Sequence, residues 1–102
     1  MKREIDTATI LNVDDDEAKR YVITRMLSKA GYTVREAATG EQALTAAFQS
    51  QPDLVVLDVN LPDLHGFEVC QKLKSDPRTA SIPVLHQCFG YMCGEQDPQR
   101  CG

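Results

Sequence analysis

The fold is decided by residues 53–63, which read Asp53-Leu54-Val55-Val56-Leu57-Asp58-Val59-Asn60-Leu61-Pro62-Asp63. The apolar run 54–57 is bounded by a Pro-Asp pair and a polar turn, a pattern typical of a strand buried on both faces of a parallel sheet. The run ends on a carboxylate, Asp58. Because open α/β sheets bind ligands at the carboxyl ends of their strands, we expect Asp58 to lie at a ligand site.

Length and composition indicate one small globular domain. The chain has 102 residues, of which 42% are hydrophobic and 25% are charged, and these values are ordinary for a single domain. The net charge is -4 and no basic stripe is present, which argues against a nucleic-acid partner. No apolar run reaches membrane-spanning length, and the N-terminus has no signal-peptide pattern, so we expect no membrane partner and a cytoplasmic location.

The four cysteines do not form a recognisable metal motif. Cys70 lies in a helical pattern, and the other three fall in residues 88–102. Their spacings match no common zinc motif. We therefore expect reduced thiols, as is usual in cytoplasmic proteins.

Strand and helix patterns alternate along the chain. The order β-α-β-α-β-α-β calls for right-handed crossovers and a parallel sheet with helices on both faces, which is a doubly wound α/β fold. The first helix is expected to bury an apolar face at helical spacing, made of Ala18, Val22, Met26, Leu27 and Ala30. Strands are expected at 9–13, 32–37, 54–57 and 82–86. Helices are expected at about 17–30, from the capping pattern at 39–42 to residue 50, and at about 66–74.

Three carboxylates should meet at one edge of this sheet. Asp14 and Asp15 follow the first strand, and Asp58 follows the third. Like charges held close together repel, and a hard divalent cation such as Mg²⁺ removes the conflict with oxygen ligands. The expected ligands are these three carboxylates and the backbone carbonyl of Asn60. Solvation of a polar loop explains the carboxylates of either loop alone, but it does not explain carboxylates in both loops at the same edge. A carboxylate beside Mg²⁺ can also attack phosphorus.

With these motifs in place, the sequence resembles the receiver domain of two-component response regulators. The resemblance covers about residues 8 to 87 and implies a flavodoxin-like, CheY-like topology with strand order 2-1-3-4-5. It rests on three motifs at matching separations: Val13-Asp14-Asp15-Asp16-Glu17, Leu57-Asp58-Val59-Asn60-Leu61-Pro62-Asp63-Leu64-His65-Gly66-Phe67-Glu68, and Ile82-Pro83-Val84-Leu85.

The resemblance implies a role for each site residue. Asp58 matches the phosphoacceptor of the family, Asp15 matches the direct metal carboxylate and Asp14 matches its partner. Asn60 matches the residue that offers its backbone carbonyl to Mg²⁺. The implied function is to accept a phosphoryl group from a sensor histidine kinase or a phosphotransfer protein. The expected domain is not an enzyme, although its parent protein could be a histidine kinase.

The resemblance ends near residue 87. The family places a Ser or Thr hydroxyl after the fourth strand, where this chain has Cys88, and a thiol is a weak hydrogen-bond donor. The family's Lys at the end of a fifth strand has no counterpart. We therefore expect an incomplete receiver domain over residues 1–87, with strand order 2-1-3-4 and the fifth strand missing or replaced, and an atypical tail over residues 88–102. A reading-frame change near Gln87 is one hypothesis for the tail, and a natural end is another.

Two other classes of function stay open at this point. The first is an interaction module that cannot be phosphorylated, or a fragment of a receiver-containing (hybrid) histidine kinase, because Cys88 and the missing Lys weaken the switch. The second is a hydrolase of the haloacid dehalogenase type, which also uses a strand-terminal Asp with Mg²⁺. That class places an acid two residues after the nucleophile, where this chain has Asn60.

A sheet without its fifth strand leaves the fourth strand as an edge. Exposed apolar edges invite pairing with another chain, so we predict a homodimer or higher oligomer formed through the strand-four edge and tail region. Light scattering at high protein concentration should give at least the mass of a dimer. A clean monomer under the same conditions would count against this prediction.

Overall fold

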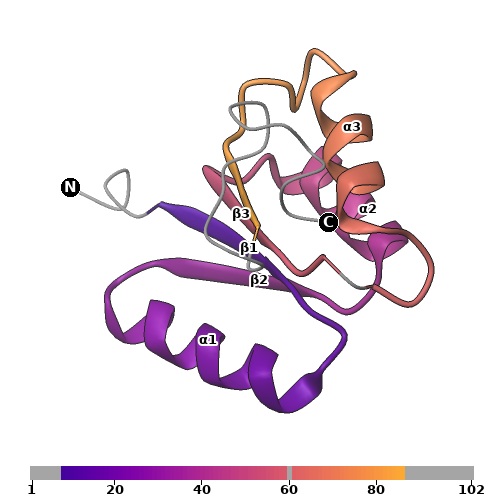
Figure 1. Cartoon of the computed structure of the whole chain (residues 1–102). Helices are drawn as coiled ribbons and strands as arrows, with labels where there is room; N and C mark the ends of the chain where they lie inside the picture. The colour runs from indigo at the N-terminus through magenta and orange to yellow at the C-terminus, as the bar shows by residue number, and fades with distance from the viewer. Residues whose placement is uncertain (1–7, 60, 87–102) are drawn as a thin grey trace, which may run out of the picture.

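The computed structural model describes residues 8–59 and 61–86, and strands and helices alternate along these residues (Figure 1). The four strands are all parallel and lie in the order β2-β1-β3-β4. The predicted α/β fold and its strand order 2-1-3-4 are therefore confirmed. The elements are β1 (Thr9–Val13), α1 (Glu17–Lys29), β2 (Thr33–Ala37), α2 (Gly40–Ser50), β3 (Leu54–Leu57), α3 (Gly66–Lys74) and β4 (Val84–His86).

The register of the sheet brings the ends of three strands to one level. Val13, the last residue of β1, lies opposite Ala37 of β2 and Leu57 of β3. One further backbone hydrogen bond extends each pairing: the Asp14 amide donates to the Ala37 carbonyl and the Asp58 amide donates to the Val13 carbonyl, both at 3.0 Å. The loops that follow β1 and β3 therefore leave the sheet side by side.

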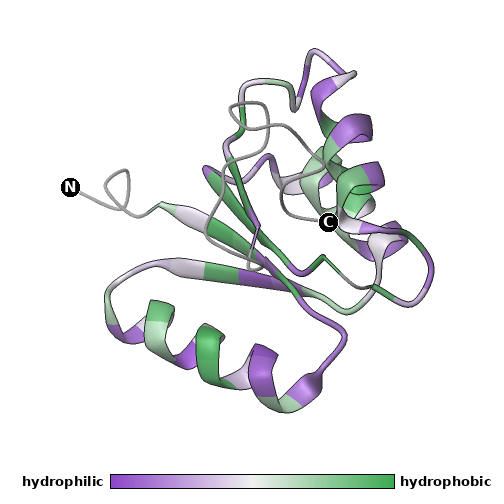
Figure 2. Cartoon of the chain, viewed as in Figure 1, coloured by the Kyte–Doolittle hydropathy of each residue, from purple (hydrophilic) through white to green (hydrophobic). Residues whose placement is uncertain are grey.

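The hydrophobic core lies between the sheet and the α2–α3 layer, and α1 covers the opposite face (Figure 1). Figure 2 shows apolar residues along the inner strands and on the sides of α2 and α3 that face them. Burial of each Val, Leu or Ile side chain contributes about 1.5–3 kcal/mol to folding. The buried residues of this cluster are Leu11, Val13, Ala37, Ala43, Leu44, Ala47, Val55, Leu57, Val69, Cys70, Leu73, Ile82 and Val84.

Helix α1 departs from its prediction, because none of its residues is buried. Val22 is 53% exposed and Met26 is 65% exposed, so the expected apolar face is not covered by the described residues. Polar contacts attach the helix instead. The buried Asn12 side chain of β1 donates through Nδ2 to the Arg20 carbonyl and to Thr24 Oγ1, both at 3.1 Å.

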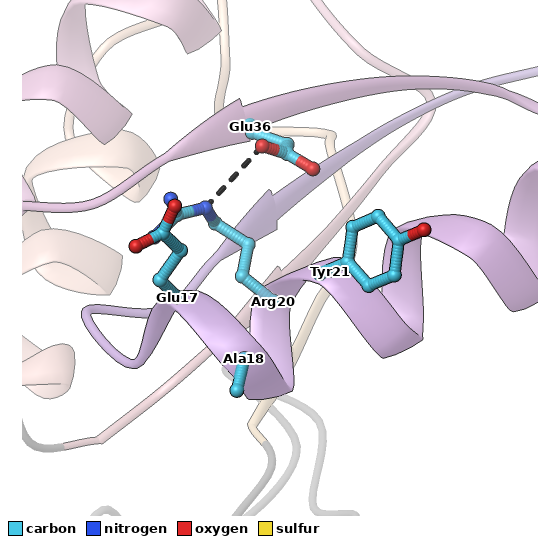
Figure 3. Close-up of a pocket in the computed structure, with 5 residues that line it drawn as sticks. All are labelled: Glu17, Ala18, Arg20, Tyr21 and Glu36. Carbon is cyan, nitrogen blue, oxygen red and sulfur yellow. Dashed lines mark hydrogen bonds and ion pairs between the residues drawn. The ribbon is translucent and has the colours of Figure 1, made fainter.

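A second polar contact ties α1 to β2. Arg20 Nε donates to Glu36 Oε1 at 3.3 Å (Figure 3). Both side chains line a hollow beside the first turns of α1, together with Glu17, Ala18 and Tyr21. The helix is thus tied to the sheet by hydrogen bonds from β1 and β2, while Ile23 and Leu27 are half-buried.

One further detail differs from the sequence prediction. Strand β4 begins at Val84 and not at Ile82, because the Ile82 amide bonds to the Thr79 carbonyl in a turn at 3.0 Å and Pro83 has no N–H to donate. Cys70 is 1% exposed and belongs to the hydrophobic cluster. The expectation of reduced thiols stays a prediction, because the other three cysteines lie outside the described residues.

Strand β4 pairs only with β3 among the described residues. Whether its outer edge pairs with a second copy of the chain stays a prediction. Over residues 8–59 and 61–86, no helix combines the length and the apolar character needed to cross a bilayer.

His86, at the end of β4, is a buried imidazole. It is 1% exposed, neither ring nitrogen has a hydrogen-bond partner among the described residues, and its ring packs edge-on against Phe67 with centroids 5.1 Å apart. Burial, and then the nearby His65, lower the pKa of His86 from its ordinary value of 6.5. The folded state therefore favours the neutral ring.

We predict that His86 makes the domain less stable in mild acid. Above the ordinary pKa the ring is neutral in both states, but below it the unfolded chain gains a proton that the folded chain resists. The free energy of unfolding should fall as the pH drops from about 7.5 to about 5.5, by at most about 1.4 kcal/mol per pH unit. Urea unfolding at several pH values measures it. His86→Leu should flatten this dependence, and an equally steep dependence in the variant would contradict the prediction.

Candidate metal centre

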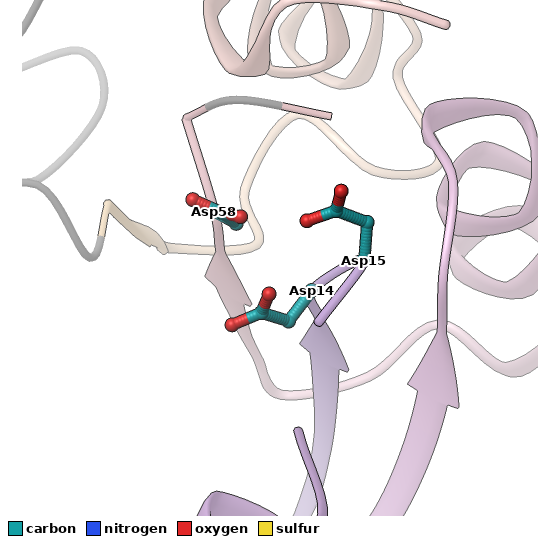
Figure 4. Close-up of side chains that lie close together, drawn as sticks. All are labelled: Asp14, Asp15 and Asp58. Atoms are coloured by element: carbon teal, nitrogen blue, oxygen red, sulfur yellow. The ribbon is translucent and has the colours of Figure 1, made fainter. Parts of the chain in front are cut away.

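Three carboxylates gather where β1 and β3 end (Figure 4). Asp14 and Asp15 come from the loop after β1, and Asp58 comes from the loop after β3. One oxygen of each lies within 4.8 Å of the others. Asp14 is fully buried, Asp58 is partly buried and Asp15 is exposed. We call these three residues the acidic triad; its oxygen atoms and its exposed side suit a hard divalent cation that keeps part of its water.

The two oxygens of the Asp14 carboxylate have different surroundings. Oδ1 accepts a hydrogen bond from the Asp16 amide at 2.9 Å. Oδ2 is buried and accepts no hydrogen bond from the described residues, while Lys19 Nζ lies 3.4 Å away as an ion pair. A buried carboxylate without full compensation is costly. The Oδ2 atom therefore favours a cation beside it.

Lys19 is the cation beside this atom, and it extends from the first turn of α1. Its side chain is 49% exposed, whereas Asp14 is 0% exposed. Partial burial lowers the pKa of Lys19, but the carboxylates of Asp14, Asp58 and Asp16 outweigh that effect and hold the pKa above its usual value of 10.5. The negative charge at the acidic triad therefore favours the protonated form of the Lys19 side chain.

Hydrogen bonds between side chains and backbone atoms hold the loop after β1 in place. Arg20 Nη1 donates to the Asp14 carbonyl at 2.7 Å, and the same guanidinium reaches Glu36 of β2. Asp16 caps α1, because its Oδ1 accepts from the amides of Ala18 and Lys19 at 3.0 and 3.2 Å. These contacts fix the direction in which the loop presents its carboxylates.

The loop after β3 is fixed by a carboxylate at its far end. Asp63 accepts hydrogen bonds from the Gly40 amide at 2.7 Å and from the Glu41 amide at 3.0 Å. These two amides begin α2, and their hydrogen bonds lower the pKa of Asp63. The loop that carries Asp58 is thus tied to the N-terminus of α2.

A close approach of Gly66 completes this loop. The Gly66 amide donates to the Val59 carbonyl at 2.8 Å. A side chain at position 66 would bring its Cβ to 2.9 Å from both the Asp58 carbonyl oxygen and the Val59 Cα, closer than real Cβ atoms come. Only glycine lets α3 begin this close to Asp58.

Sequence reasoning missed several supporting residues. His65 is exposed and caps α3: its Nδ1 accepts from the Phe67 amide at 3.2 Å, and its own amide donates to Glu68 Oε1 at 2.9 Å. Lys19 and Asp63 were not predicted to contribute either. The predicted residues Asn60 and Cys88 lie outside the described residues.

A family model gives this geometry its context. The model that describes the response regulator receiver domain matches residues 10–87. The chain belongs to the response regulator receiver family. The resemblance inferred from the sequence is thereby confirmed.

Relatives of known sequence and structure agree with this membership. The receiver domain is 49% identical over 76 residues to the DNA-binding dual master transcriptional regulator RpaA of Synechocystis, and 40% identical over 78 residues to Protein PilH of Pseudomonas aeruginosa. Among solved structures, the N-terminal domain of a receiver protein from Methanoculleus marisnigri superposes with a TM-score of 0.75 at 40% identity, over 78% of this chain and 64% of that one. CheY4 of Vibrio cholerae gives 0.76 at 34% identity, over 78% and 67%.

The chain matches only part of these relatives. The alignment spans 74% of this chain but 32% of RpaA, and 76% of this chain but 64% of PilH. Receiver domains interact with histidine kinases or phosphotransfer proteins, and they generally use Mg²⁺ at an acidic pocket. The acidic triad fits such an ion, since it offers oxygen atoms alone and includes a buried oxygen that accepts no hydrogen bond in the described part of the chain.

The prediction that the chain is not an enzyme is contradicted by this membership. A receiver domain is a phosphoacceptor, and the relatives are response regulators, among them PleD of Caulobacter vibrioides at 44% identity over 79 residues. The nucleophile of a phosphoacceptor forms a covalent bond in a group-transfer reaction. The prediction already described the domain as a phosphoryl acceptor, and only its exclusion of enzymes is withdrawn.

We predict that Gly66→Ala destabilises the domain, although alanine is the better helix former by about 1 kcal/mol. The new methyl group meets backbone atoms of Asp58 and Val59, and such overpacking costs about 1–3 kcal/mol. Urea unfolding gives the free energy of unfolding of the variant. Gln71→Ala, on the exposed side of the same helix, is the control and should change little. A Gly66→Ala protein as stable as the parent would show that the loop can move aside.

Proposed function

We propose that this receiver domain accepts a phosphoryl group on Asp58 from the phosphohistidine of a sensor histidine kinase or phosphotransfer protein, with Mg²⁺ as cofactor. The observation that carries the proposal is the acidic triad: oxygens from the loops after β1 and β3 within 4.8 Å. Membership of the receiver family supports the same assignment.

The proposed ligands of Mg²⁺ are the carboxylates of Asp14, Asp15 and Asp58 and the backbone carbonyl of Asn60. When bound, Mg²⁺ supplies positive charge for the phosphoryl oxygens and relieves the repulsion within the triad. Asp15 is exposed and Asp14 is buried, so the proposed roles differ. Asp15 would hold the ion directly, and Asp14 would hold it as the partner of Asp15.

Asp58 is the proposed nucleophile because it is partly buried and follows the central strand β3. A carboxylate oxygen of Asp58 forms a bond to phosphorus while the P–N bond of the donor phosphohistidine breaks. The electron pair of that bond stays on the imidazole nitrogen of the donor, and an acyl phosphate forms on Asp58. The contacts of Arg20 and Asp63 keep the two loops in place for this step, so little reorganisation is needed.

The proposal also covers the extent of the domain, its tail and its location in the cell. We propose that residues 1–87 form the receiver unit and that residues 88–102 are a separate tail. Cys88 occupies the position where the family has a hydroxyl, and we propose that its thiol is a poor substitute in binding the phosphoryl group. We also propose a cytoplasmic location, which, like the kinase partner, rests on membership of the receiver family.

The proposal predicts that the protein gains the mass of one phosphoryl group on incubation with acetyl phosphate and Mg²⁺. Intact-mass spectrometry measures the gain, and circular dichroism establishes that the sample is folded. Omission of Mg²⁺ with a chelator present should abolish the gain, because the triad is then left without its cation.

Two variants make this test specific. Asp58→Asn should remove the gain entirely, and Asp53→Asn should leave it intact, since Asp53 lies at the opposite end of β3. No gain in a folded protein would contradict phosphoryl acceptance by this chain and would favour an interaction module that cannot be phosphorylated. A gain that survives in Asp58→Asn would contradict the choice of nucleophile.

A further inference from the structure

We infer that Lys19 is a built-in counterion of the acidic triad, which offsets part of its negative charge in the metal-free protein and is displaced when a divalent cation binds. The inference rests on the proposed function, and it adds a residue that tunes the site without being a ligand. Three independent features of the structure support it.

The first feature is the position of Lys19 in α1. The helix begins at Glu17, so Lys19 lies in its first turn, where the helix dipole disfavours a positive charge. Local anions have to compensate for this placement. The Lys19 ammonium lies 3.4 Å from Asp14 Oδ2, and the carboxylates of Asp58 and Asp16 also act on it.

The second feature is the Asp14 carboxylate itself. It is fully buried, its Oδ1 is satisfied by the Asp16 amide, and its Oδ2 has no hydrogen bond within residues 8–59 and 61–86. The atom that faces Lys19 is therefore the atom that most needs a cation. A divalent cation in the triad places a second positive charge near this atom, and the two cations repel each other.

The third feature is the freedom of the Lys19 side chain. It is 49% exposed and sits on a flexible four-carbon stem, so the ammonium can turn into solvent while α1 stays in place. Displacement of the Lys19 ammonium then costs electrostatic energy but requires no unfolding of α1. Lys19 should weaken divalent-cation binding while it stabilises the metal-free protein.

Isothermal titration with MgCl₂ at constant ionic strength tests this inference on four proteins: the parent chain, Lys19→Gln, Lys19→Arg and Lys29→Gln. Lys29 lies in the last turn of the same helix, so its variant makes the same change in net charge away from the triad. We expect Lys19→Gln to bind Mg²⁺ about 3- to 5-fold more tightly, the upper end of what one partly exposed ion pair contributes. Lys29→Gln and Lys19→Arg should stay within about twofold of the parent.

Thermal unfolding gives a second readout that does not depend on phosphorylation. Without metal, Lys19→Gln should melt a few degrees below the parent, because the triad has lost its counterion. Saturating Mg²⁺ should cancel or reverse this difference, because tighter binding stabilises the variant more. A variant that melts like the parent without metal would overturn the counterion role.

The outcomes separate this inference from the proposed function. If the parent binds Mg²⁺ and Lys19→Gln binds it no more tightly than Lys29→Gln, the inference about Lys19 is overturned and the metal site stands. Weaker binding by Lys19→Gln would also overturn it and would make Lys19 a supporting residue. If none of the four proteins binds Mg²⁺, the proposed metal site fails and the inference fails with it.

Discussion

The parallel pairing of β1 with β3 is the constraint on which the rest of the structure depends. Val13 and Leu57 lie opposite each other, and the bond from the Asp58 amide to the Val13 carbonyl carries the pairing one residue further. A slip of one residue would send every side chain of a strand to the other face of the sheet. The register that buries the core is therefore also the register that sets Asp14 beside Asp58.

Much of this arrangement follows from sequence patterns that act over short distances. The apolar run 54–57, bounded by turn residues, predicted β3 with its observed bounds, and the strand before Asp14 was predicted equally well. Once both strands are parallel and central, their following carboxylates must lie at one edge. The convergence of the acidic triad could thus be anticipated from the order of elements, without knowledge of any side-chain contact.

The misses concern contacts that no short-range pattern encodes. The apolar spacing of α1 predicted burial, but burial depends on what covers the helix, and within residues 8–59 and 61–86 nothing covers Met26. Asp63 binds the start of α2 from a loop 23 residues away in sequence, a pairing that exists only after the chain has folded. His65 is an unusual capping residue, so only the Glu three positions later hinted at a helix start. A Lys in the first turn of a helix was the one available sign of Lys19, since that position is electrostatically unfavourable without an anionic partner.

The buried charge of Asp14 shows how stability and chemistry compete at this edge. A fully buried carboxylate would be expensive if left alone, and the fold offsets only part of this cost: one oxygen bonds to the Asp16 amide, while the other has an ion pair with a half-exposed lysine. Complete satisfaction by neutral donors would make the site more stable and would leave no reason for a cation to bind. Incomplete satisfaction keeps binding energy available, because a divalent cation removes a penalty that the folded protein still carries. Arg20 and Asp63, which hold the two loops in place, then matter for a further reason. Their contacts prevent the loops from relaxing away from each other, so that repulsion within the acidic triad is retained until a cation relieves it.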